Sequence, residues 1–135
     1  LDAALNYEVG KSAQVIPGKD AADGYGLSGV FFSAQLGVVF VNDLLVHPGT
    51  LKSLTAVEGI CRVVGEETGL IHAQRRDSDN AEYLVKIDAN TLKEISSDHL
   101  LDTHQMASYF SLDLQNRKYA VSDPAKAQVT VHDLD

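Results

Sequence analysis

Residues 30–46 of the chain read VFFSAQLGVVFVNDLLV, and this stretch decides the fold class. Valine, phenylalanine and leucine make up most of it, and β-branched and aromatic side chains favour strands over helices. Gly37 and the pair Asn42-Asp43 interrupt the apolar run, so we predict two or three buried strands. A transmembrane helix needs about 20 predominantly apolar residues with few or no charges. The stretch therefore does not predict a membrane span.

The chain on the C-terminal side of this stretch continues as predicted hairpins. Residues 60–64 and 70–75 form two apolar segments around the turn sequence GEETG at 65–69. The next segment, 82–88, has the period of two that is typical of a strand with one buried face and one face in water. Its two predicted faces are Tyr83, Val85 and Ile87 on the buried side, and Glu82, Lys86 and Asp88 on the wet side.

The end of the chain also indicates an antiparallel meander. Residues 110–114 and 119–121 carry alternating apolar side chains around a turn at 115–117. After Pro124, which lies between strands, a last strand is predicted to be half buried. Its predicted inward face is Ala127, Val129 and Val131, alternating with Gln128, Thr130 and His132.

Two segments are candidates for short helices. Thr50 could cap a helix whose inward side chains, Leu51, Leu54 and Val57, are three residues apart and which Gly59 would end. Residues 97–107 could form the second helix or an ordered loop. Together these patterns predict a mainly β fold, an antiparallel meander or sandwich-like sheet with one or two short helices.

The strands and Asp-containing turns from residue 82 to residue 133 also have the spacing that is typical of β-propeller blades. A propeller ring needs about four or more four-stranded blades of roughly 40 residues each. The sequence pattern supports fewer than two blades, and the chain has room for three at most. We therefore expect a sandwich or an open, partly rolled sheet.

Length and charge restrict the class of protein. The chain has 135 residues, 44% of them hydrophobic, and a formal net charge of −8. These values predict a single domain over 1–135, with 1–29, rich in glycine, alanine and aspartate, as a flexible N-terminal arm or long loop. An acidic chain repels phosphate backbones, so nucleic acid is an unlikely partner. The start at Leu1, without a signal-peptide pattern, leads us to expect a processed product or a fragment.

Motifs for cofactors and nucleophiles are weak. GYGLSG at 24–29 has the spacing of a dinucleotide loop, but no strand precedes it and no helix pattern follows. DSDN at 77–80 begins like a calcium loop and then departs from it, so an Asx turn explains it better. Cys61 cannot form an internal disulfide, which fits a reducing compartment without requiring one, and we expect a small buried residue there. The sequence predicts no catalytic residue and no cofactor.

One cluster could bind a metal ion or transfer protons. Imidazole and carboxylate groups suit zinc, iron or manganese, and His72 or His47 could complete such a site across the sheet. The alternative interpretation is a polar connection between two sheet elements. The predicted metal ligands are Asp98, His99, Asp102 and His104.

Two hypotheses about function follow from the sequence. The first is a non-catalytic β-rich association module, a subunit of a homo-oligomer or of a larger assembly, which uses open sheet edges or the N-terminal arm to bind a protein partner or itself. The second is a small metal-dependent enzyme or ligand-binding domain that uses the cluster at 98–104. We favour the first hypothesis because the chain lacks a convincing catalytic set.

Overall fold

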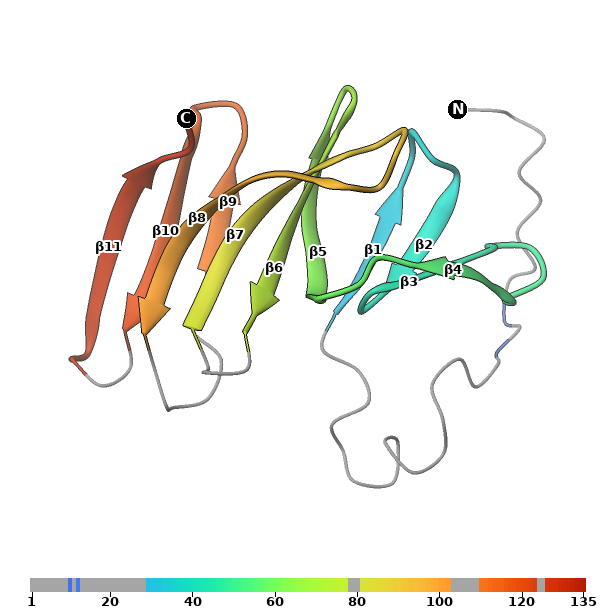
Figure 1. Cartoon of the computed structure of the whole chain (residues 1–135), viewed down its shortest axis with the longest axis horizontal. Helices are drawn as coiled ribbons and strands as arrows, with labels where there is room; N and C mark the ends of the chain where they lie inside the picture. Colours follow the sequence, from blue (N-terminus) through green and yellow to red (C-terminus); the bar gives the residue numbers. More distant parts are fainter. Residues whose placement is uncertain (1–9, 11, 13–28, 78–80, 103–109, 124–125) are drawn as a thin grey trace.

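All regular elements in the described part of the chain are β-strands (Figure 1). The computed structural model describes residues 10, 12, 29–77, 81–102, 110–123 and 126–135. In each of its three antiparallel sheets, every strand pairs with its neighbours in the sequence. The first sheet contains β1 (Val30–Ser33), β2 (Val38–Val41), β3 (Leu44–Val46) and β4 (Ser53–Ala56). The second contains β5 (Ile60–Glu67), β6 (Leu70–Arg76), β7 (Ala81–Asp88) and β8 (Glu94–Asp102), and the third contains β9 (Phe110–Asp113), β10 (Lys118–Asp123) and β11 (Gln128–Asp133).

The apolar stretch at 30–46 folds into three strands, as its interruptions predict. Gly37 lies in the turn between β1 and β2, and the pair Asn42-Asp43 forms the turn between β2 and β3. Asn42 adopts a φ of 54°, a left-handed conformation that asparagine tolerates better than most residues. Its Oδ1 accepts a hydrogen bond from the backbone N–H of Gly29 (3.2 Å), and this contact fixes the turn against the start of β1.

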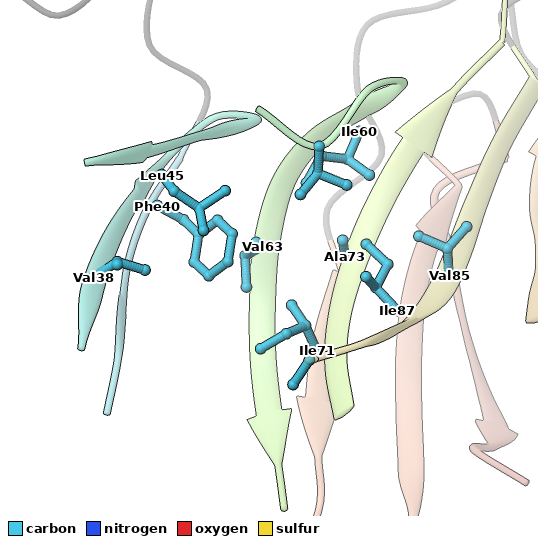
Figure 2. Packing of buried hydrophobic residues seen from close by; sticks show 11 residues of the cluster. Val38, Phe40, Leu45, Ile60, Val63, Ile71, Ala73, Val85 and Ile87 are labelled. Carbon is cyan, nitrogen blue, oxygen red and sulfur yellow. The ribbon is translucent and has the colours of Figure 1, made fainter. Parts of the chain in front are cut away.

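The second sheet lies between the other two and is buried on both faces. One face packs on the first sheet in a cluster that includes Phe40, Leu45, Val63, Ile71 and Val85 (Figure 2). The other face packs on the third sheet in a smaller cluster of buried and half-buried side chains. That smaller cluster contains Leu84, Tyr119, Val121 and Leu134, with Val64, Leu100, Phe110, Leu112 and Leu114 packed against them.

The three sheets approach one another most closely through their first strands. β5 contacts β1 and β2 on one side and β9 on the other. The last strand of the first sheet also leads directly into the first strand of the second, through residues 57–59. The predicted antiparallel meander is therefore confirmed, but it forms three stacked units instead of one sheet or a two-layer sandwich.

The predicted helices are absent from the described residues. The segment expected to follow Thr50 as a helix contains β4, and Leu54 on this strand is 57% exposed instead of facing inward. β4 completes the first sheet by pairing with β3, so tertiary hydrogen bonding overrides a weak local spacing of three. The second candidate, 97–107, begins as part of β8, and 103–109 lie outside the described residues. The predicted N-terminal arm, 1–29, also lies almost entirely outside them.

Two predictions about burial are wrong for the same reason, the stacking of the sheets. Glu82 was expected in water but is 1% exposed, because the third sheet and the side chain of Arg76 cover that face of β7. Val129 and Val131 were expected to face inward, yet they are 71% and 64% exposed. β11 lies at the far edge of the third sheet, where no described strand covers it.

Candidate association surface

The outer edge of β11 is the most accessible pairing edge in the described part of the chain. The first and second sheets have four strands each, whereas the third has three, in the order β11-β10-β9. All six residues of β11 are exposed, and β10 is its one partner among the described strands. An edge strand presents a row of backbone N–H and C=O groups that can pair with another strand. The third sheet therefore offers a place for a fourth strand.

The outer edges of the other two sheets are less suited to pairing. β4 is only four residues long, and β8 is paired to β7 with two shifts of register. β8 also carries the acidic side chains of Glu94 and Asp98. Short strands, irregular register and charge are the usual protections of an edge against association. β11 has neither a short length nor a register shift, because it pairs with β10 over six consecutive residues. It contains no lysine or proline, and its one acidic side chain, Asp133, is paired with Lys118.

The third sheet holds β11 in a fixed position. Tyr119 on β10 is 6% exposed, and the ring of His132 on β11 stacks on it with centroids 5.0 Å apart. Burial and the nearby carboxylate of Asp98 raise the pKa of the Tyr119 hydroxyl, so the phenol stays neutral. Leu134, directly after β11, is 1% exposed, and its N–H donates to the carbonyl of Arg117 (2.9 Å). The edge is therefore preformed and loses little entropy when a strand is added.

A polar network joins the three sheets at the turns that follow their first strands. Glu66 accepts hydrogen bonds from the Ser33 hydroxyl (2.6 Å) and the Ala34 N–H (2.8 Å) of the first sheet. Glu67 contacts His72 Nε2 (2.7 Å) and the guanidinium of Arg117 in the third sheet. Arg117 in turn donates two hydrogen bonds of 2.8 Å to Asp135, which also accepts one from Lys86 (3.1 Å).

These contacts determine the protonation of the acids in the network. The hydrogen bond with His72 lowers the pKa of Glu67, although partial burial opposes the shift. The hydrogen bonds from Arg117 and Lys86 hold the pKa of Asp135 far below its usual range, and the acid raises the pKa of Arg117. Glu67, Arg117, Asp135 and Lys86 each have an opposite charge beside them, so these ion pairs fasten the second and third sheets together.

The predicted metal ligands do not form a cluster among the described residues. Asp98 and His99 are neighbours on β8, so their side chains point to opposite faces of the second sheet. The His99 ring packs edge-on against Tyr83 (5.3 Å between centroids), whereas the carboxylate of Asp98 acts on Tyr119 in the third sheet. Asp102 ends β8, and His104 lies outside the described residues. No group of three or more His, Cys, Asp or Glu side chains that could hold a metal ion occurs in the described ranges.

The other histidines and Cys61 have local roles. His72 is fully buried in β6 against Glu67, and its Nδ1 has no hydrogen-bond partner in the described part of the chain. His47 Nδ1 accepts hydrogen bonds from the N–H groups of Gly49 (3.0 Å) and Thr50 (3.1 Å), which shapes the loop before β4. Cys61 is half buried at the start of β5, so the prediction of a small buried residue is only partly met.

The sequence indicated an open edge without locating it. The alternation in 127–132 predicted a strand correctly but assigned its apolar side chains to a core. The one available signal was the absence of lysine and proline from β11, since edge strands that avoid pairing often carry them.

Comparisons of this chain with protein-family models, with curated proteins and with solved structures found no match. No helix among the described residues has the length and apolar character needed to cross a membrane.

Proposed function

We propose that this protein is a non-catalytic association module that pairs with a second copy of itself through the outer edge of β11. The observation that carries the proposal is the difference between the third sheet, with three strands, and the first two, with four. β11 is also a regular edge of six residues, all of them exposed, in the described structure. Addition of a strand to such an edge satisfies its backbone groups and covers its exposed valines.

The sequence of β11 is compatible with antiparallel pairing to its own copy. A two-fold axis perpendicular to the sheet at Thr130 places this residue opposite its own copy and brings Gln128 opposite His132 and Val129 opposite Val131. No like charges face each other in this register, and like charges directly opposite would be destabilising. Each subunit contributes the same surface patch to the interface, as in most symmetric dimers. The product is one continuous six-stranded sheet, three strands from each copy.

The test is the solution mass of the full chain, measured by sedimentation velocity over a concentration series. We expect a concentration-dependent dimer. Val129→Lys and Val131→Lys should each shift the equilibrium to monomer, because an edge lysine blocks strand addition. Both valines are exposed, so neither change should lower the stability of the fold appreciably.

Ile95→Lys is the matched control. Ile95 is 57% exposed on β8, at the outer edge of the second sheet, so it receives the same change outside the proposed interface. This variant should dimerise normally. A chain that stays monomeric at all concentrations would overturn the proposal, and so would a dimer that survives both lysine substitutions in β11.

A further inference from the structure

A pocket of about 320 Å³ lies where the first and second sheets end together. It is bounded by the turn between β2 and β3 on one side and by the ends of β5, β6 and β7 on the other. Its lining residues are Asn42, Asp43, Ile60, Cys61, Arg62, Gln74, Arg76 and Glu82. The pocket is separate from β11 and from the polar network that joins the sheets.

The pocket contains hydrogen-bond donors that lack acceptors within the described structure. Gln74 is only 3% exposed, and its Oε1 accepts a hydrogen bond from Arg62 Nε (2.9 Å). No described residue accepts a hydrogen bond from Gln74 Nε2 or from the two terminal nitrogens of Arg62. Arg76 Nε is buried and also without a partner among the described residues. Buried polar groups in proteins are nearly always hydrogen-bonded, so Arg76 Nε points to a bound acceptor, and Gln74 Nε2 and the Arg62 terminal nitrogens are left available to one.

The guanidinium of Arg62 is held in place before any ligand binds. Its Nε donates a hydrogen bond to Gln74 Oε1, and its aliphatic carbons pack against Gly29. This packing is so close that a Cβ added to Gly29 would lie 2.6 Å from the Arg62 Cβ. The remaining two nitrogens form a planar fork, the geometry that matches the two oxygens of a carboxylate. An arginine fixed in this way loses little rotamer entropy on binding.

The charges around the fork select among anions. Arg76 is paired with the buried Glu82 (2.5 Å), so these two charges cancel. Asp43 lines the same pocket and opposes the charge of Arg62. With that pair neutral, a dianionic phosphate would meet the guanidinium of Arg62 and the opposing carboxylate of Asp43, whereas a monoanion meets less repulsion. Ile60 and Cys61 add an apolar wall that suits a short hydrocarbon chain.

We propose that this pocket binds the carboxylate of a small aliphatic acid, with Arg62 and Gln74 as the residues that recognise its two oxygens. This inference does not depend on the proposed dimer, because none of the lining residues belongs to β11. Failure of one proposal therefore leaves the other standing.

The test is titration of the full chain with butyrate, followed by calorimetry and by the side-chain NMR signals of Arg62 and Gln74. Butyramide and inorganic phosphate, at matched ionic strength, serve as the neutral and dianionic probes. We expect butyrate to bind more tightly than either probe and to shift both side-chain signals. Arg62→Met, which keeps the apolar stem, should weaken butyrate binding about tenfold or more, as expected for loss of a charge-assisted bidentate contact.

Two further variants make the result specific. Gln74→Leu should also weaken butyrate binding, while Lys52→Met, which removes an exposed cation outside the pocket, should leave it unchanged. Circular dichroism of each variant checks that it is folded. Equal binding of butyrate and butyramide, tighter binding of phosphate, or undiminished binding by Arg62→Met would each overturn the proposal.

Discussion

Leu84→Ala tests the stacking of the second and third sheets. Leu84 lies on β7 between Glu82 and Lys86, on the face that the sequence pattern assigns to water. In the structure it is 2% exposed and packs with Tyr119, Val121 and Leu134. A water-facing Leu84 and a buried Leu84 predict very different losses in the free energy of unfolding when the side chain is truncated.

The expected cost follows from the burial of the side chain. Leucine to alanine removes three carbons, and at about 0.8 kcal/mol per buried methylene the transfer loss is roughly 2.4 kcal/mol. The cavity left behind adds to this, and buried leucines in other proteins give a total of about 2–5 kcal/mol. If residue 84 faced water, the substitution would change the free energy of unfolding by no more than about 0.5 kcal/mol.

The assay is urea unfolding followed by circular dichroism. With a slope of about 1–3 kcal/mol per molar urea, typical of small proteins, the midpoint for Leu84→Ala should fall by roughly 1 M. Leu54→Ala is the matched control, because it makes the same chemical change at a side chain that is 57% exposed on β4. If Leu84→Ala costs no more than Leu54→Ala, the second and third sheets do not pack as described.

Two further predictions concern the contacts between sheets. In the folded protein the pKa of Glu67 is lowered from 4.5 and that of Asp135 from 3.8. Both carboxylates therefore stabilise the fold fully above their unfolded-state pKa values. This stabilisation is lost as the pH falls through the lower pKa values of the folded state. The urea midpoint should therefore fall as the pH drops below about 4.5, and less steeply for Asp135→Asn; an identical decline in that variant would contradict the role of the network. Gly65→Ala would place a Cβ 2.8 Å from Leu112 Cδ2, the end of a flexible side chain that can shift, so the free energy of unfolding from thermal melts should fall by no more than about 1 kcal/mol. The loss should shrink in a Leu112→Ala background, and strictly additive effects would show that the two residues do not touch.

The candidate sites were harder to predict than the strands. That a sheet edge could serve association was a sequence-based hypothesis, but β11 could not be identified as that edge, because its alternating valines look like those of a half-buried strand. The pocket was not predicted at all. Arg62 lies on β5, Gln74 and Arg76 lie on β6, and Glu82 lies on β7, so the pocket forms only through the register of these three strands.

What the sequence determined by itself was the local structure: the apolar run at 30–46 with its breaks at Gly37 and Asn42, and the hairpins at 60–75 and 110–121. Turn preference and the period of two act between near neighbours, so they can be read from the chain directly. The tertiary structure alone decided that the meanders stack through their first strands, that the second sheet is buried on both faces and that β11 is an open edge. Burial depends on which sheet covers a face, and that partner is brought there by contacts between residues distant in the sequence. Glu82 and Val129 show the consequence, since an acidic residue became buried and a valine became exposed.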